Sequence, residues 1–257
     1  MSQTQWIVAA LVLLVVIIIA VLAKAVVVYR RDRKAHFASG AASLPAIVIF
    51  FRHCEKVDSV CDKSAAFPAC CVSKHAPPFS CDDCSAQGYL RAHGLPASMT
   101  ALLAQIAVST RLSGSPLTAI YAAGSQETNS KCSRSRRMWE ITVPLAAAYS
   151  LPVNTAYCTD QQQAAAQDIL ANNPGGIVAV GWEHNALPAL VGWTMALAQD
   201  PKATAPAKVQ KWPGGSVFDQ YWIVDLRSGA PVFSVLPEKI LPTDCPYPQT
   251  TAECVAP

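Results

Sequence analysis

The stretch Leu44–Val57, "LPAIVIFFRHCEKV", contains an apolar run that ends on arginine and histidine. The run from Pro45 to Phe51 is rich in β-branched and aromatic residues and is too short to cross a membrane. It predicts a strand buried on both faces, as in a parallel sheet. In open α/β sheets, ligands bind just beyond the carboxyl ends of such strands. Arg52 and His53 therefore either bind a ligand or merely mark where the strand meets water.

Arg52 and His53 carry side chains suited to anion chemistry. A guanidinium offers a planar fork of donors to a phosphate or carboxylate. A neighbouring imidazole can act as a base or a nucleophile at neutral pH. A second apolar segment, "GGIVAVGW" (175–182), runs into Glu183 and His184. Two predicted strands therefore end on a histidine.

A third apolar segment, "LTAIYAA" (117–123), leads into a polar, basic loop over residues 125–137. The cationic residues of this loop are Lys131, Arg134, Arg136 and Arg137. If the three strand ends meet at one edge of the sheet, two histidines and two or more arginines form an anion site that contains a nucleophile. Each feature alone has a structural explanation, since such histidines are often core residues and basic loops are usually solvated.

The strands alternate with segments that predict helices, which indicates an α/β domain over residues 44–242. The predicted helices are 85–106, with a break near Gly94–Pro96, and 138–149, 164–171 and 187–198. The segments "FDQYWIVDL" and "PVFSVL" predict late strands. Residues 243–257 are expected to form a C-terminal tail.

The N-terminus predicts a membrane anchor. Every residue from Trp6 to Ala23 is apolar, and after Lys24 the apolar character continues to Tyr29. We therefore expect a tail over 1–5 and a transmembrane helix over 6–29, with aromatic residues at both interfaces. A cleaved signal peptide is the competing interpretation, but a basic region before the apolar run is missing.

Two features give opposite predictions for the side of the membrane on which the domain lies. The basic linker over 30–43 starts with "RRDRK", and the positive-inside rule then puts the domain in the cytoplasm. The ten cysteines favour an oxidising compartment, so the domain faces a lumen or the exterior if they form disulfides. The net charge of +3 is too small and too dispersed to indicate a nucleic-acid partner.

A cysteine-rich insert over residues 55–84 follows the first strand. Cys81 and Cys84 have the spacing of zinc ligands, but a structural zinc site usually shows two such pairs. We therefore favour disulfides or free thiols over zinc and expect no metal or other cofactor.

Four motifs in the same order resemble those of the histidine phosphatase superfamily, which has the phosphoglycerate mutase-like fold. The family's Arg-His-Gly is similar to Arg52-His53-Cys54, and its first helix is similar to "CSAQGYLRAHGL". The segments "SRSRRMWEITVPLAAAYSLPVNTAY" and "GIVAVGWEHNALPAL" resemble the two remaining motifs. The resemblance covers residues 44–236. It implies a three-layer sandwich with a mostly parallel central sheet.

The resemblance also implies roles for the site residues. His53 would attack phosphorus and carry a phosphohistidine, while Arg52, His184 and a loop arginine bind the phosphoryl oxygens. The loop arginine is Arg137, or Arg136 if the motif is shifted by one residue. The candidates for the proton donor are Glu183, Glu127 and Glu55. Cys54 stands where the family usually has glycine, so it is expected to narrow the pocket or to add a thiol beside the nucleophile.

These observations predict a membrane-anchored phosphatase that hydrolyses a phosphomonoester. The first alternative is a catalytically inactive member that binds a phosphorylated ligand. The second is a cysteine-rich structural membrane protein in which the histidines are incidental. The substrate class is open.

Overall fold

The computed structural model describes residues 44–56, 83–110 and 117–241. The predicted anchor over 6–29, the linker over 30–43, most of the cysteine-rich insert and the tail over 243–257 lie outside these residues. No helix within the three described ranges is long and apolar enough to cross a membrane.

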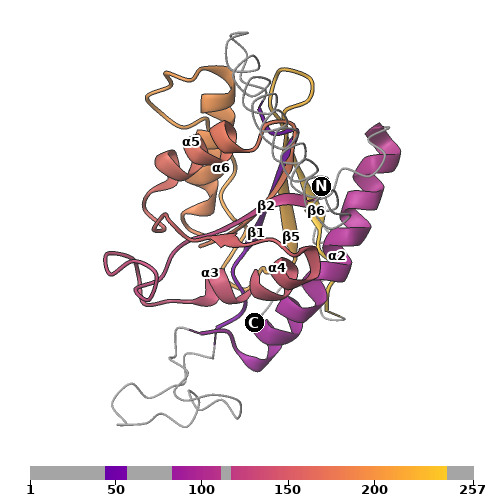
Figure 1. Ribbon diagram of the computed structural model, residues 1–257, viewed down its shortest axis with the longest axis vertical. Coiled ribbons are helices and arrows are strands. Elements are labelled where there is room, and N and C mark those ends of the chain that lie inside the picture. The colour runs from indigo at the N-terminus through magenta and orange to yellow at the C-terminus, as the bar shows by residue number, and fades with distance from the viewer. Residues whose placement is uncertain (1–43, 57–82, 111–116, 242–257) are drawn as a thin grey trace, which may run out of the picture. The chain divides into compact units, whose positions relative to one another are not determined.

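A mixed sheet forms the centre of the domain (Figure 1). It has six strands in the order β3-β2-β4-β1-β5-β6. Strands β1, β2, β3 and β4 are parallel, whereas β5 runs antiparallel to both β1 and β6. The strands are β1 (Ile47–Arg52), β2 (Leu117–Ala122), β3 (Val153–Asn154), β4 (Ile177–Trp182), β5 (Gln220–Asp225) and β6 (Val232–Pro237). The carboxyl ends of β1, β2 and β4 therefore lie at the same edge.

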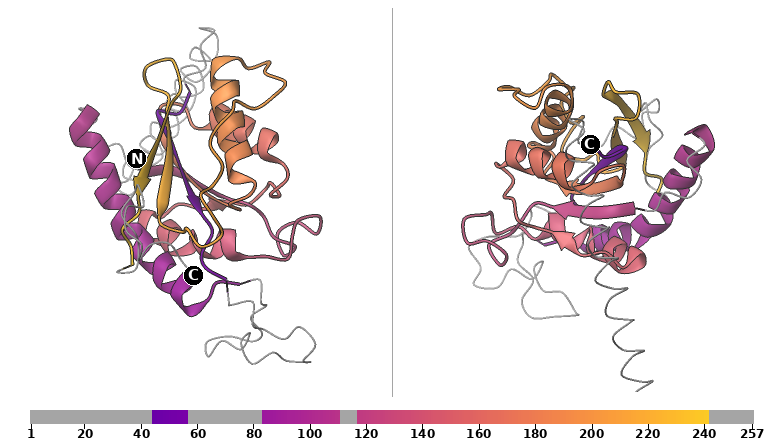
Figure 2. Two further views of the ribbon diagram at one scale, coloured as in Figure 1. Left: turned by 180° about the vertical axis from the view of Figure 1, so that it is seen from behind. Right: turned by 45° about the horizontal axis from the view of Figure 1, so that its top comes forward.

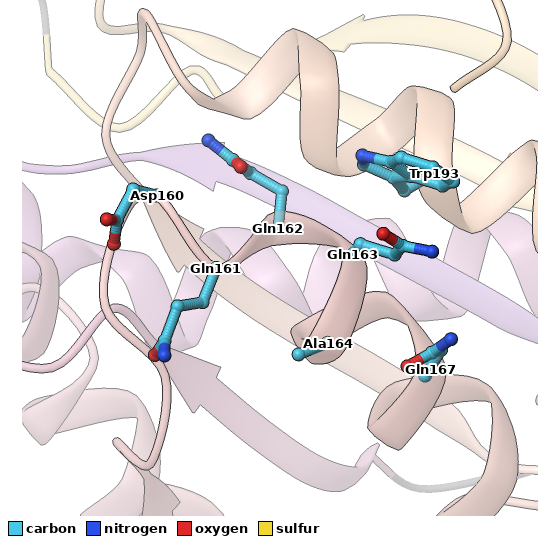
Figure 3. Close-up of a pocket in the computed structure, with 7 residues that line it drawn as sticks. All are labelled: Asp160, Gln161, Gln162, Gln163, Ala164, Gln167 and Trp193. Carbon is cyan, nitrogen blue, oxygen red and sulfur yellow. The ribbon is translucent and has the colours of Figure 1, made fainter. Parts of the chain in front are cut away.

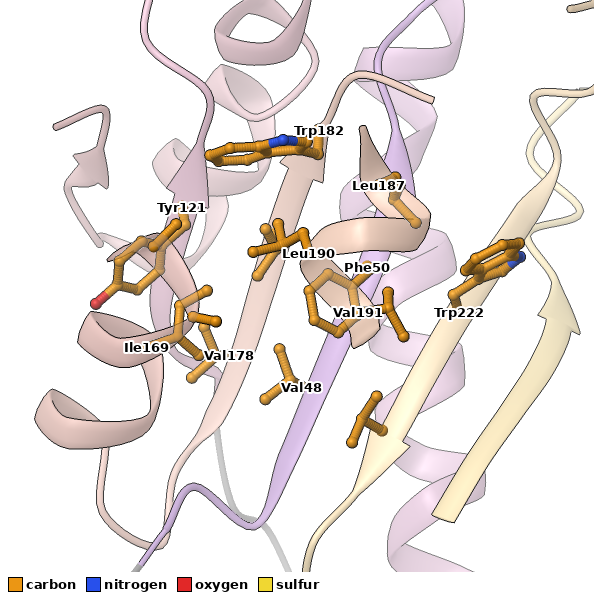
Figure 4. Packing of buried hydrophobic residues seen from close by; sticks show 14 of the residues in the cluster. Val48, Phe50, Tyr121, Ile169, Val178, Trp182, Leu187, Leu190, Val191 and Trp222 are labelled. Carbon is orange, nitrogen blue, oxygen red and sulfur yellow. The ribbon is translucent and has the colours of Figure 1, made fainter. Parts of the chain in front are cut away.

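Helices cover both faces of this sheet (Figure 2). One face packs against α2 (Ala86–Thr110) and α4 (Val143–Tyr149), and the other against α5 (Gln162–Asn172) and α6 (Leu187–Gln199). Successive side chains of a strand point to opposite faces. Val48 and Phe50 accordingly join the cluster under α5 and α6 (Figure 4), while the other core residues of β1 face α2. The continuous apolar run of β1 is thus explained by burial on both faces.

Two helix predictions are corrected by the structure. The expected break near Gly94–Pro96 is wrong, because α2 continues through Pro96. A Cβ on Gly94 would lie 2.4 Å from Cγ2 of Ile240, so this glycine permits close packing rather than a bend. The predicted helix over 138–149 is two helices, α3 (Arg137–Glu140) and α4.

Candidate active site

The two histidines meet because β1 and β4 are neighbours. Arg52 pairs with Trp182 at the end of the ladder, and the backbone N–H of His53 donates to the carbonyl of Trp182 (3.0 Å). His53 and His184 therefore leave the same edge of the sheet side by side. Nε2 of His53 lies 3.2 Å from Nδ1 of His184.

The carbonyl of Cys54 sets the tautomer of His53. Nδ1 of His53 lies 2.7 Å from this oxygen, and a carbonyl can only accept a hydrogen bond, so Nδ1 carries the proton. Nε2 is then unprotonated and faces His184. The ring is buried, and burial lowers its pKa well below the ordinary value, with a further lowering by Arg137 and Arg52. His53 is therefore a neutral imidazole with a free lone pair at neutral pH.

Arg52 is held against the wall of the site by backbone carbonyls. Its Nη1 donates to the carbonyls of Val217 (2.7 Å) and Gly214 (3.1 Å), and its guanidinium lies 3.6 Å from the ring centre of Phe218. Burial, followed by repulsion from Arg137, lowers its pKa to about 9. Its buried Nε has no hydrogen-bond partner in the described part of the chain. Buried donors are nearly always paired, so an anion would complete this site.

The two adjacent arginines of the basic loop point to different partners. Nη1 of Arg137 lies 3.4 Å from Nδ1 of His53. Arg136 instead donates two hydrogen bonds to Asp83 (3.0 and 2.8 Å) and pairs with Glu127 (3.1 Å) and Glu140 (3.6 Å). The structure thus places Arg137 beside His53 and Arg136 in an acidic cluster.

Glu183 supports His184 and the start of α6. Its carboxylate lies 2.8 Å from Nδ1 of His184 and accepts hydrogen bonds from the backbone N–H groups of Asn185 (2.8 Å) and Ala186 (3.0 Å). Burial alone would raise its pKa, but the hydrogen bond and charge of His184 and the N–H of Ala186 together lower it to about 2. Glu183 is therefore ionised at neutral pH, which suits an orienting role better than proton donation.

The other two candidate acids pair with arginines. The side chain of Glu127 is 64% exposed and bonds to Arg136, so the structure does not bring it to either histidine. Glu55 forms an ion pair of 2.7 Å with the buried Arg91. Arg91 belongs to the second motif, so this pair ties the motif on α2 to the residues that follow β1.

The expectation that Cys54 adds a thiol beside the nucleophile is wrong. Its sulfur is bonded to Cys84, and a second disulfide joins Cys132 to Cys158. The structure shows no free cysteine within the described ranges. Both bonds agree with the preference for disulfides over zinc.

The charges at the strand ends favour an anion over a cation. Ligand atoms of His53, Glu183 and His184 all lie within 4.8 Å of one another, which is close enough to share a metal ion. Arg52 and Arg137 bring two positive charges to the same ring of His53, however, and would repel that ion.

A surface hollow of about 470 Å³ lies elsewhere, beside the first turn of α5 (Figure 3). Glutamines of α5 and the ring of Trp193 from α6 line it. It includes none of the predicted site residues, so the candidate site is the charged strand edge.

Three groups that contact Arg52 at the charged strand edge were not predicted from the sequence: the ring of Phe218 and the carbonyls of Gly214 and Val217. The "PGG" sequence signals a turn, but no residue type signals which carbonyl meets Arg52.

No family model and no curated protein matches the sequence. One similar solved structure is that of a protein assigned as phosphohistidine phosphatase SixA from Agrobacterium tumefaciens. It has 12% identity over 75% of this chain and 96% of that chain (TM-score 0.34). A protein assigned as SixA from Nakamurella multipartitia has 15% identity over 74% of this chain and 95% of that chain (TM-score 0.34). A protein assigned as an alpha-ribazole-5'-P phosphatase from Escherichia coli has 13% identity over 75% and 96% (TM-score 0.35). The resemblance to the histidine phosphatase superfamily therefore rests on the four sequence motifs, and the structure brings His53, His184 and Arg137 from three of them to one edge of the sheet.

Proposed function

We propose that the chain is a phosphatase that hydrolyses a phosphomonoester through a phosphohistidine on His53. The observation that carries this proposal is the fixed tautomer of His53, whose unprotonated Nε2 lies in a site with two arginines. A neutral imidazole is a nucleophile, and the arginines supply the charge that a phosphoryl group needs. A purely structural histidine would need neither arginine.

The reaction takes two displacements at phosphorus. In the first, the lone pair of His53 Nε2 forms a bond to phosphorus while the bond to the leaving oxygen breaks. Arg52, Arg137 and His184 neutralise the phosphoryl oxygens, and the phosphoryl group replaces the 3.2 Å contact between the two rings. In the second, water attacks phosphorus, the P–N bond breaks, and inorganic phosphate leaves with His53 neutral again.

Glu183 acts in this scheme as an orienting carboxylate for His184. Because Glu183 is ionised at neutral pH and Glu127 pairs with Arg136, esters whose leaving group needs no proton should react fastest. We therefore expect p-nitrophenyl phosphate to be hydrolysed faster than an alkyl phosphate.

The test uses the full chain, purified in mild detergent without reductant and assayed with p-nitrophenyl phosphate from pH 4 to 8. His53→Ala should abolish turnover. His93→Ala is the matched control, because His93 is exposed on α2 and should retain it. An acid-labile phosphate on the wild-type chain, absent from His53→Ala, would identify the intermediate. Turnover that survives in His53→Ala would refute the proposal.

A second candidate is a member that binds a phosphorylated ligand without hydrolysing it. The observation that favours it is the low pKa of Glu183, which leaves the proton donor unassigned. This alternative predicts that the wild-type chain binds phosphate but hydrolyses neither p-nitrophenyl phosphate nor an alkyl phosphate. A structural membrane protein would bind no phosphate at all.

We also propose that residues 6–29 anchor the chain in a membrane and that the domain faces an oxidising compartment. The apolar run supports the anchor, and the two disulfides support the compartment, since such bonds are rare in the cytosol. The positive-inside rule argues for the opposite side. A membrane-impermeable reagent distinguishes the two: it labels an exterior domain in intact cells, a cytoplasmic domain once the plasma membrane alone is permeabilised, and a lumenal domain only after detergent opens all membranes.

A further inference from the structure

Two short segments lie side by side next to the nucleophile. The disulfide joins Cys54 to Cys84, and Lys56 and Cys84 form an antiparallel bridge. The backbone N–H of Ser85 donates to the carbonyl of Glu55 (2.8 Å). The carbonyl that sets the tautomer of His53 belongs to Cys54. The group that orients the nucleophile is therefore part of a cross-linked residue.

The same crosslink reaches the residues on both sides of Arg137. The backbone N–H of Cys84 donates to Oε2 of Glu140 (2.7 Å), and Asp83 accepts both hydrogen bonds from Arg136. Sγ of Cys54 lies 3.6 Å from the carbonyl oxygen of Arg137. The disulfide thus stands where the segment that carries His53 meets the segment that carries Arg137.

The first turn of α2 closes over this junction. A Cβ on Gly88 would lie 2.7 Å from the carbonyl oxygen of Glu55, 3.0 Å from Cβ of Cys54 and 3.2 Å from Cβ of Cys84. Only glycine permits this approach without a shift of the backbone. Cys54 is 0% exposed and Cys84 is 4% exposed. A crosslink enclosed in this way transmits a displacement of one segment to the other, because packed interiors yield little.

We propose that the Cys54–Cys84 disulfide positions His53 and Arg137 for phosphoryl transfer, so that both cysteines are positioning residues of the reaction. The inference rests on the proposed phosphatase function. Glycine at the third position of the Arg-His-Cys motif could form no such crosslink. Cys54, the residue after His53, instead bonds to Cys84, whose backbone N–H donates to Glu140 in the helix that begins at Arg137. A misplacement of about 1 Å at a reacting group lowers a rate by about 100-fold.

The first experiment compares two double variants of the full chain, Cys54→Ser/Cys84→Ser and Cys132→Ser/Cys158→Ser. Each variant loses one described disulfide, so the second controls for a general loss of stability. With p-nitrophenyl phosphate we expect kcat of the first variant to fall by about 10- to 100-fold. Its KM should change less than kcat, because the carbonyls of Gly214 and Val217 still hold Arg52. The control should keep the kcat of the wild type.

The pH profile separates positioning from stability. Once the Cys54 carbonyl is no longer held, water reaches His53. The regained hydration raises the pKa of His53 more than the lost hydrogen bond to Cys54 lowers it, so the acid limb of kcat/KM moves to higher pH. A disulfide that only stabilises the fold would lower the unfolding temperature and leave this limb in place. Equal kcat and an unmoved limb in the folded Cys54→Ser/Cys84→Ser variant would overturn the inference while the phosphatase function stands. No turnover by the wild-type chain overturns both.

Reduction of the wild-type chain covers the case in which the variant does not fold. Dithiothreitol gives two electrons and two protons to the S–S bond, which becomes two thiols as the reagent closes to its own cyclic disulfide. Alkylation and peptide mass measurement then show which cysteines have opened. Loss of turnover in step with the opening of Cys54 and Cys84, and its return when a parallel sample that was reduced but not alkylated is reoxidised, supports the inference. Full turnover with both cysteines alkylated overturns it, and so does a non-reduced chain in which the two are free thiols bound to zinc.

Discussion

At the scale of the single residue, the neutral state of His53 is set by its charged neighbours as well as by burial. Both effects lower its pKa, so the reactive unprotonated form persists to a pH well below 6.5. We expect kcat/KM of the wild type to fall only in that acidic range. Replacing Arg137 by alanine removes a positive charge beside Nδ1. The pKa of His53 should then rise, and the acid limb should move to higher pH.

The measurement is the pH dependence of kcat/KM with p-nitrophenyl phosphate, because this ratio reports groups of the free enzyme. Arg134→Ala is the control, since Arg134 is exposed in the same loop and contributes the same charge. We expect its limb to coincide with that of the wild type. If Arg137→Ala shows the wild-type limb, the charge of Arg137 does not act on His53.

Glu183 allows a second prediction at this scale. In Glu183→Gln the amide oxygen can still accept the backbone hydrogen bonds of Asn185 and Ala186, but an amide nitrogen replaces the oxygen that faces His184, and the charge is lost. Charged hydrogen bonds are worth about 1.4 kcal/mol more than neutral ones, so we expect kcat to fall about tenfold. Steady-state kinetics at pH 7 check this. A larger loss in Glu127→Gln than in Glu183→Gln, measured with an alkyl phosphate, would contradict the orienting role of Glu183 and assign the proton donor to Glu127.

At the scale of the element, the close contact between β4 and α3 positions Arg137. A Cβ on Gly181 would lie 2.9 Å from Cγ2 of Thr142 and 3.1 Å from the carbonyl oxygen of Met138. Gly181→Ala should therefore push α3 away from the sheet and lower the free energy of unfolding by about 1–3 kcal/mol. Urea unfolding measures this change, and kcat should fall with it because α3 begins at Arg137.

Gly215→Ala is the matched control for this substitution. A Cβ at Gly215 would meet nothing within 4 Å, so its stability should match that of the wild type. Equal unfolding free energies for Gly181→Ala and Gly215→Ala would show that β4 and α3 separate without strain.

Elements were easier to predict than contacts. Strands β1 and β4 were predictable because residues buried on both faces leave a continuous apolar run. The antiparallel direction of β5 was not predictable, since the residues of a strand do not indicate whether it runs parallel or antiparallel to its neighbours. Arg136 and Arg137 are adjacent in sequence, and only the start of α3 decides which of them faces His53. The pairing of Cys54 with Cys84 was equally hidden, because ten cysteines allow many pairings.

At the scale of the whole molecule, the site makes the fold sensitive to acid. His53 is buried with its pKa lowered below the unfolded value of 6.5, so the unfolded chain binds the proton first as the pH falls. Its contribution to stability is therefore complete above pH 6.5. Below that pH it is lost at about 1.4 kcal/mol per pH unit for as long as His53 stays neutral in the folded state.

His53→Gln removes the titrating group from this buried position. We expect its unfolding free energy to fall less steeply than that of the wild type between pH 6.5 and 5, whatever its stability at pH 7. Glu183 does not affect the slopes between pH 6.5 and 5. Its lowered pKa stabilises the folded state above pH 4.5, and this stabilisation is lost only as the pH falls toward 2. Urea unfolding at several pH values, with the disulfides intact in both proteins, measures the two slopes. Equal slopes would mean that His53 already takes up its proton in the folded state near pH 6.5, and the nucleophile would then be cationic in mild acid.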